Sequence, residues 1–262
     1  MTILTLLTKI SKKKQITQIK QKFRSYFENL DVDEKILGIN SAGWLQVSIE
    51  GEDEKIATNY LTKKIGLCPT YINNLKGNSQ LSGQISGFNG NNNVLIDIGV
   101  FKPKNFLATI SLEKLQEQLA QRKKNSLKEI VTLFGLTEGL TVNITLLKIN
   151  KEKSCVEVEF SEKQLSLFNF WQKSFLDRLI ILGSTYNEAK KAINLARLGK
   201  DVINIESAGL FEQVLTCKLG TDAAGLIPRL GKILRTAKLT VFNPKKIHLF
   251  FKTQPQLITK KV

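Results

Sequence analysis

The sequence has few of the residues that enzymes and metal sites commonly use. It contains one histidine, His248, and three cysteines, Cys68, Cys155 and Cys217, among 262 residues. The cysteines are far apart, so they provide neither a zinc-binding spacing nor a disulfide framework, and we interpret them as buried free thiols. A Ser-His or Cys-His pair would have to be built around His248, and no nucleophile elbow accompanies it. We therefore expect no enzyme: no catalytic residue, no metal and no cofactor.

Long apolar runs are missing as well. No stretch approaches the roughly 18 uncharged apolar residues of a membrane span. The opening MTILTLLTKISKKK lacks a basic region before its apolar run and a small-residue cleavage site. We expect a folded cytoplasmic protein, and 262 residues with 42% apolar content are enough for two or three small domains.

Acidic residues are scarce relative to basic ones. The sequence has 39 Lys and Arg against 23 Asp and Glu, a net charge of +16. Residues 171–262 hold 16 basic and 6 acidic side chains, so this segment alone carries +10. Such a potential attracts polyanions and raises their encounter rate, which makes nucleic acid the leading class of partner. A generally lysine-rich composition is the alternative explanation.

The two ends of the sequence resemble each other. SAGWLQVSIEGEDEKIATNYLTKKIG begins at Ser41, and SAGLFEQVLTCKLGTDAAGLIPRLGKIL begins at Ser207. Each follows an apolar strand and an amphipathic helix, and each contains a strand, a loop and a second helix. Closing strands at Thr70–Leu75 and Lys238–Phe242 would complete the βαββαβ order of a ferredoxin-like unit in both copies.

The middle of the sequence follows another pattern. Apolar alternation predicts five strands, and the first and last pairs are separated by the turns GNNN and KEK, which are typical of hairpins. A helical region precedes the fourth strand and is broken near Lys124-Asn125. This order predicts a Greek-key OB barrel with a helical insert, a fold whose strands and loops suit single-stranded nucleic acid. The strands are predicted at Gln80–Asn89, Asn93–Phe101, Phe106–Ser111, Leu140–Asn150 and Ser154–Glu162.

SGQISGFNGNNNVLIDIGVFKPKNFLATISL resembles the opening of the S-one type of RNA-binding OB domain, in which a Gly-x-Val-x-Gly strand leads to a strand with an Asp-Ile-Gly-like turn. The matching positions are Gly83, Ile85, Gly87, Val94, Asp97 and Gly99. GLTVNITLLKINKEKSCVEVEFSEKQ is similar to that domain's closing hairpin. Taken whole, and especially through KLGTDAAGLIP, the sequence resembles an archaeal family known only as a domain of unknown function. The resemblance implies a lineage and a fold, and no activity.

On the barrel we predict RNA contacts at Phe88, Phe101, Lys102, Lys104 and Phe106. Aromatic rings offer stacking surfaces for bases, while lysines follow the phosphates. The resemblance to the S-one domain implies the aromatic contacts at Phe88 and Phe101 in particular. Tyrosine is missing from this predicted surface. A place in the barrel core is the alternative for each phenylalanine.

A second candidate contact lies near the C-terminus. Arg229, Lys232 and Arg235 are spaced by three, so they fall close to one face of a helix, and Lys218 lies in the loop before it. Such a face suits a phosphate backbone, and a solvated face is the alternative. The segment lacks the Gly-Lys-Ser/Thr ending of a phosphate loop. Because Pro228 belongs in a first helical turn, we predict an extended loop over 220–225, which is either a backbone contact or a plain turn.

We therefore predict an α+β protein in which two ferredoxin-like units flank a central five-stranded OB barrel with a helical insert. The predicted domains are 1–77, 78–165 and 166–250, with a tail over 251–262. The predicted function is non-catalytic RNA binding in translation, where the protein would associate with the ribosome, or in RNA maturation. Two alternatives remain: an assembly factor that docks protein partners through paired ferredoxin-like sheets, and a nucleotide-dependent enzyme that uses the glycine-rich loop.

Overall fold

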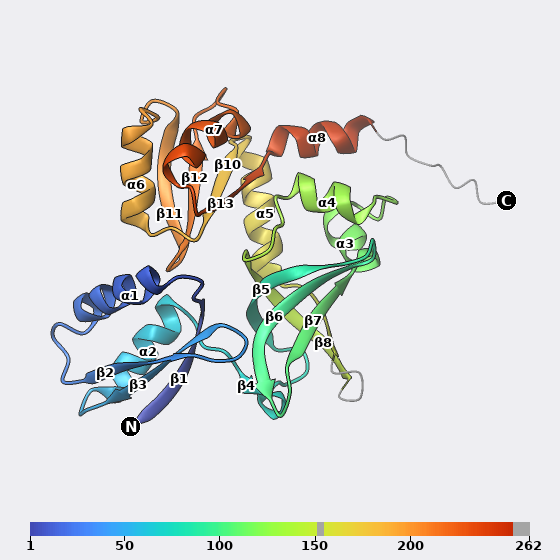
Figure 1. Ribbon diagram of the computed structural model, residues 1–262. Coiled ribbons are helices and arrows are strands. Elements are labelled where there is room, and N and C mark those ends of the chain that lie inside the picture. Colours follow the sequence, from blue (N-terminus) through green and yellow to red (C-terminus); the bar gives the residue numbers. More distant parts are fainter. Residues whose placement is uncertain (151–154, 254–262) are drawn as a thin grey trace. The chain divides into compact units, whose positions relative to one another are not determined.

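The computed structural model describes residues 1–150 and 155–253. Contacts divide the chain into two compact units. The described residues of 1–86, 95–110 and 141–159 form one unit, and those of 87–94, 111–140 and 160–262 form the other. The protein is an α+β protein with a central five-stranded mixed barrel and two flanking antiparallel sheets with helices (Figure 1). None of the helices described is both long and apolar enough to cross a membrane.

The N-terminal sheet is three-stranded and antiparallel, in the order β1-β3-β2. The strands β1 and β3 are largely buried, and the helices bury Ile19, Phe23, Ala57 and Leu61. The elements are β1 (Thr2–Lys9), α1 (Lys13–Tyr26), β2 (Asp33–Ile39), β3 (Trp44–Glu50) and α2 (Glu54–Lys64).

The predicted closing strand Thr70–Leu75 does not join this sheet, so that prediction is wrong. The segment 66–68 lies beside β1 instead: Cys68 N donates to Thr5 O at 2.8 Å, and Leu6 forms an antiparallel bridge with Leu67. Pro69 follows and has no N–H, so the pairing ends there. The next residues, β4 (Thr70–Tyr71), pair in parallel with a barrel strand.

The barrel strands occur where the sequence predicts them. They are β5 (Gln80–Asn89), β6 (Asn93–Lys102), β7 (Phe106–Ser111), β8 (Thr141–Asn150) and β9 (Cys155–Phe160). Neighbours run β6-β5-β8-β9-β7, and a further β6–β7 pairing closes the circuit, with β7 and β9 parallel. A 3-10 helix, η1 (Ile72–Asn74), lies between β4 and β5.

Two features of the barrel were predicted in detail. The GNNN turn joins β5 to β6 as predicted, and Gly90 in it has a positive φ of 56°. The helical insert is broken as predicted, into α3 (Leu112–Leu119) and α4 (Leu127–Leu133), because Ser126 caps a new helix by accepting from Glu129 N. The predicted KEK turn (151–153), Ser154 and residues 254–262 of the predicted tail lie outside the described residues.

Asp97 joins the N-terminal sheet to the barrel within the first unit. Its carboxylate accepts from Trp44 Nε1 at 3.1 Å, from Gly99 N at 2.9 Å and from Lys9 Nζ at 2.5 Å. Trp44 is fully buried. Gly99 has a φ of 74°, and a Cβ there would lie 2.4 Å from Cys68 Sγ, so this position requires glycine. The Asp-Ile-Gly segment therefore fixes the middle of β6 against the N-terminal sheet.

The C-terminal sheet has four antiparallel strands in the order β11-β12-β10-β13. Along the chain, the elements from β10 to β13 follow the βαββαβ order predicted for the C-terminal copy, and Lys238–Phe242 is its last strand. The elements are α5 (Glu162–Ser174), β10 (Arg178–Leu182), α6 (Tyr186–Leu195), β11 (Val202–Gly209), β12 (Glu212–Cys217), α7 (Ala223–Ile233), β13 (Lys238–Phe242) and α8 (Pro244–Thr253). The helices α5 and α8 were not predicted.

The domain boundaries 1–77, 78–165 and 166–250 stay predictions.

Candidate nucleic-acid interface

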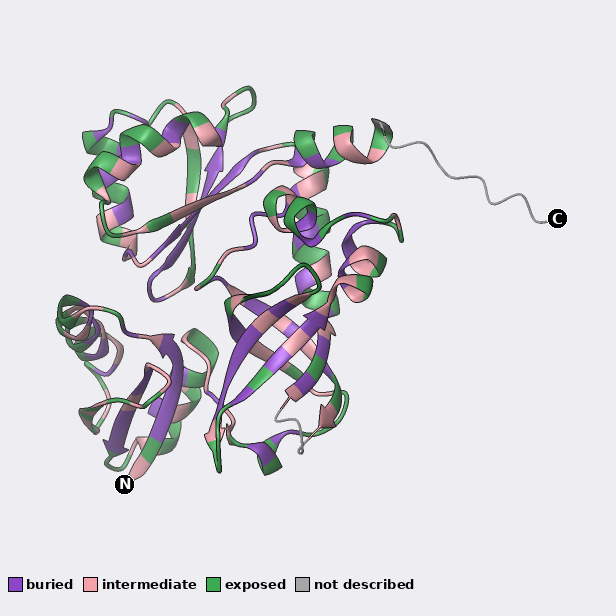
Figure 2. Ribbon diagram, turned by 45° about the vertical axis from the view of Figure 1, so that its right-hand side comes forward, coloured by how far each residue is buried: buried purple, intermediate pink, exposed green. Residues whose placement is uncertain are grey.

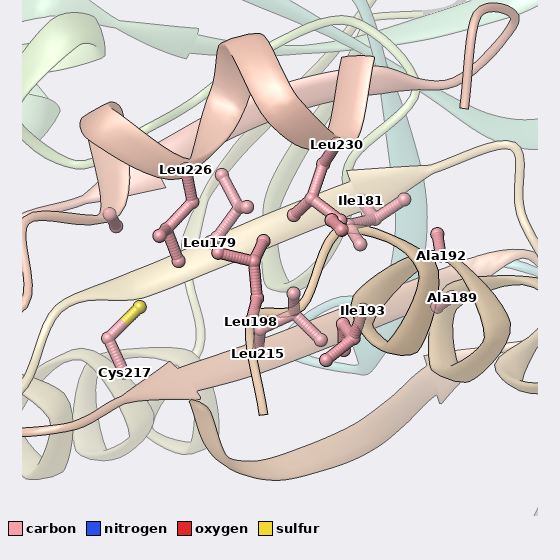
Figure 3. Close-up of a cluster of buried hydrophobic side chains, with 12 residues drawn as sticks. Leu179, Ile181, Ala189, Ala192, Ile193, Leu198, Leu215, Cys217, Leu226 and Leu230 are labelled. Atoms are coloured by element: carbon pink, nitrogen blue, oxygen red, sulfur yellow. The ribbon is translucent and has the colours of Figure 1, made fainter. Parts of the chain in front are cut away.

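The helices α6 and α7 lie on one face of the C-terminal sheet, where apolar side chains hold them (Figure 3). Leu179, Ile181 and Leu215 of the strands pack against Ile193 of α6 and Leu226 of α7. Each of these side chains is at most 5% exposed. Burial of this size stabilises each helix position by about 1.5–3 kcal/mol per large apolar side chain. The opposite sides of the two helices are left for solvent (Figure 2).

The exposed side chains of α6, of α7 and of the residues next to them include eight cations. All of them are exposed, and none forms an ion pair with any residue in the part of the chain that the structure describes. We call them the basic surface: Lys190, Lys191, Arg197, Lys200, Lys218, Arg229, Lys232 and Arg235. The four C-terminal contacts predicted from the sequence are therefore all exposed, and four further cations are exposed on α6 and in the residues that follow it.

Arg229 also has a structural role in this surface. Its Nη2 donates to Ala196 O, at the C-terminal end of α6. Arg197, which follows with a φ of 54°, adds a second cation there. Cations at a helix C-terminus stabilise its unpaired carbonyl groups. Lys232 and Arg235 have no such role; the one bond from Arg235 is an exposed one, from its Nε to Lys232 O at 3.3 Å.

The acidic side chains of the same segment are largely used for folding. Glu188 closes a capping box with Thr185 at the start of α6, and Asp222 caps α7 by accepting from Ala224 N. Asp177 and Glu212 are buried. Of the six acids, only Asp201 and Glu206 are neither buried nor capping a helix. The cations therefore remain unneutralised on the surface because most acids are used elsewhere.

The glycine-rich loop is shorter than predicted. The helix α7 begins at Ala223 and not near Leu226, so Pro228 lies inside it. Two contacts stabilise this start: Asp222 caps the helix, and Asp177 Oδ2 accepts from Ala223 N at 3.1 Å and from Asn243 Nδ2 at 3.0 Å. Burial, together with the charge of Asp222, raises the pKa of Asp177, and the bond from Ala223 N opposes this shift.

This arrangement leaves little room for a phosphate at the start of α7. The amides of Ala223 and Ala224 already donate to carboxylates, and the Gly225 amide donates to Asp222 O at 3.1 Å. The two acids would also repel a phosphate. The geometry favours a capped turn at this point, with the cations of α7 lying further along the helix.

The other face of the C-terminal sheet is covered within the same unit. Phe242 of β13 stacks on Phe168 of α5, with ring centroids 5.8 Å apart, and contacts Trp171 at 5.1 Å. Phe134 lies 5.8 Å from Phe242, and Gly135 O accepts from Thr240 Oγ1 at 3.1 Å. Base readout across an open sheet is therefore not available on this part of the sheet.

The predicted barrel contacts are not all at the surface. Phe106 is only 2% exposed, so it belongs to the barrel core and cannot stack on a base. Lys102 and Lys104 are exposed, and Phe101 is half-buried. Phe88 is 37% exposed and ends β5 beside the turn at 90–92, whereas Phe101 lies at the far end of β6 from that turn.

The structure adds one aromatic residue that was not predicted. Tyr71 pairs with Lys102 in the parallel β4–β6 ladder and is 48% exposed. Lys102 Nζ donates to Tyr71 Oη at 3.3 Å and lies 5.2 Å from the ring centroid. The prediction that tyrosine is missing from the barrel surface is therefore wrong. We call Tyr71, Lys102 and Lys104 the Tyr71 platform.

Family models match both ends of the chain. The model of the DUF2110 N-terminal domain matches residues 3–70, and that of the DUF2110 C-terminal domain matches residues 176–242, together about half of the chain. The chain belongs to the DUF2110 family. The matched ranges hold the two flanking sheets, and the DUF2110 C-terminal range includes all eight cations of the basic surface. The function of this family is unknown, and no curated protein matches the chain.

The solved structures that match the chain have low sequence identity to it and low TM-scores. The uncharacterized protein MJ1198 from Methanocaldococcus jannaschii is 8% identical, with a TM-score of 0.24, over 34% of this chain and 95% of that one. The intact alpha subunit of aIF2 from Pyrococcus abyssi is 10% identical, with a TM-score of 0.26, over 64% and 97%. A chain of the a/eIF2alpha–aDim2p–rRNA complex from Pyrococcus horikoshii OT3 is 13% identical, with a TM-score of 0.26, over 47% and 60%. We base the functional proposals on the residues of the DUF2110 protein itself.

Proposed function

We propose that this DUF2110 protein binds RNA without chemical turnover, through the basic surface of its C-terminal sheet and through its barrel. The observation that carries the proposal is that the acidic and basic side chains of the C-terminal part lie in different environments. Most acids there are buried or cap helices, while eight exposed cations form no ion pair with any described residue. Such a surface costs self-repulsion unless it meets a polyanion.

The barrel supports nucleic acid over other polyanions. Its strand circuit, with β7 parallel to β9, is the arrangement of an OB barrel, and we propose that it is one. We propose further that the C-terminal sheet is a ferredoxin-like unit and that the N-terminal sheet is a copy with a reduced fourth strand at 66–68. We place the protein in translation, on the ribosome, or in RNA maturation.

The test is binding of fluorescein-labelled RNA, single-stranded and duplex, to the purified full-length protein freed of nucleic acid. If the basic surface engages four to eight phosphates, the logarithm of the affinity should fall with the logarithm of salt concentration with a slope of about −3 to −6 for single strands. Duplex DNA of the same length serves as the control that shows whether the protein prefers RNA to DNA. Absence of RNA binding at low salt would refute the proposal.

A protein-assembly role is the second candidate, and a specific observation favours it. Phe170 and Phe175 at the end of α5 are 65% and 45% exposed, and Leu249 of α8 is 58% exposed. Exposed apolar side chains of this size are common in protein interfaces. The covered face of the C-terminal sheet argues against docking through that sheet. The assembly role would be supported over RNA binding by two results together. The protein would bind no RNA, and it would co-purify with one stoichiometric protein partner that is lost in Phe170→Asp.

A further inference from the structure

Tyr71 is an exposed aromatic ring on a fixed piece of backbone. Cys68 on one side and Ile72 and Leu75 on the other are each at most 8% exposed, so the chain is anchored around it. Tyr71 N donates to Pro69 O at 2.7 Å, and Asn74 Nδ2 donates to the same carbonyl at 2.7 Å. The ring is thus presented to solvent with little backbone freedom left to lose on binding, which favours affinity.

The ring also lies beside a cation. Lys102 Nζ is 3.3 Å from Tyr71 Oη and 5.2 Å from the ring centroid, and Lys104 is exposed two residues further on. An aromatic ring next to a lysine matches the two parts of an unpaired nucleotide, because the base stacks on the ring and the phosphate pairs with the ammonium group.

The surrounding sequence is almost free of negative charge. Between residues 55 and 112 the only acid is Asp97, against six lysines. Asp97 is 7% exposed and already paired with Lys9. Nothing in this stretch therefore repels a phosphate at the Tyr71 platform.

We propose that Tyr71 stacks on an unpaired base of RNA while Lys102 and Lys104 contact the adjoining phosphates. This inference rests on the proposed RNA binding and names its preferred ligand, a single-stranded segment. The stacking residue comes from β4, outside the five barrel strands, where the sequence had placed no contact.

The first test compares variants of the full-length protein for binding to fluorescein-labelled U12 RNA and to a blunt 12-base-pair duplex. Loss of one stacking contact should weaken U12 binding by about 5- to 150-fold in Tyr71→Ala. Duplex affinity should stay within twofold, because paired bases are not free to stack. Tyr71→Trp should retain U12 binding.

Phe170→Ala is the matched control, since it removes another exposed aromatic ring far along the sequence, on α5. It should leave U12 affinity unchanged. If Tyr71→Ala binds U12 within twofold of wild type while removal of Lys232 and Arg235 weakens it, the stacking proposal is overturned and RNA binding stands. If wild type binds neither RNA, both proposals are overturned.

A second measurement does not depend on how a variant folds. Wild-type protein is crosslinked to 4-thiouridine-labelled U12 and digested with trypsin. The nucleotide adduct should fall on the peptide of residues 65–76, IGLCPTYINNLK, at Tyr71. Adducts confined to other peptides would contradict the proposal.

Discussion

The basic surface makes a quantitative prediction for the double variant Lys232→Ala/Arg235→Ala. These two cations are exposed, and their side chains bond to no other element among the residues described. Arg229 is left in place because it bonds Ala196 O and holds α7 to α6. If each removed cation contacts one phosphate, the slope of log affinity for single-stranded RNA against log salt concentration should become shallower by about 1.4.

This change of slope converts directly into affinities. We take the variant and wild type to bind equally at about 1 M salt, where the two plots of log affinity against log salt concentration meet. The variant should then bind about 70-fold more weakly than wild type at 50 mM salt and about tenfold more weakly at 200 mM. Fluorescence anisotropy with labelled U12 over this salt range measures both numbers. Circular dichroism melting checks that the fold is kept.

The matched control is Lys163→Ala/Lys173→Ala, which removes the same charge from exposed positions of α5. Its slope should equal that of wild type. An equal loss of slope in both double variants would mean that overall charge, and not the basic surface, attracts the RNA. An unchanged slope in Lys232→Ala/Arg235→Ala would show that α7 makes no backbone contact.

Two further predictions concern the fold. Asp97→Ala should lower the free energy of unfolding by about 3 kcal/mol, because the buried indole N–H of Trp44 loses its acceptor. Urea titration measures this free energy. A loss below about 1 kcal/mol would contradict the anchoring role of Asp97. Iodoacetamide at pH 8 should modify Cys155 first, since burial raises the pKa of Cys217 to about 11 and raises that of Cys68 still further. Peptide mass mapping over time checks the order, and early alkylation of Cys217 in the folded protein would refute it.

Local signals in the sequence were enough to predict most of the helices and strands. The GNNN turn, the alternating strands of the barrel and the break in the helical insert depend on residues within a few positions of one another. The helix α5 carried such a signal too, with Ser161 as its cap and Phe168 and Trp171 as buried positions on one side. No element was predicted for the residues between the last predicted barrel strand and the C-terminal copy, so this helix was missed.

What could not be predicted depends on contacts between distant residues. The Ala223 N–H at the start of α7 donates to Asp177, which lies 46 residues earlier in the sequence. Tyr71 becomes part of a surface only because β4 pairs with β6, which brings it beside Lys102, 31 residues away. The burial of Phe106 likewise follows from barrel closure. The sequence could place the cations of α7, whose spacing is helical, but it could not place an isolated tyrosine.

The two proposed contacts differ in the kind of interaction, and this difference separates them experimentally. The basic surface contributes through ion pairs with phosphates, so its loss should change how steeply affinity depends on salt. The Tyr71 ring contributes through stacking, which releases few counterions. Tyr71→Ala should therefore weaken binding to U12 by nearly the same factor at 50 and 200 mM salt, whereas Lys232→Ala/Arg235→Ala should weaken it about sevenfold more at the lower concentration. If Tyr71→Ala changes the slope instead, the tyrosine acts by positioning Lys102 against a phosphate, and base stacking is refuted.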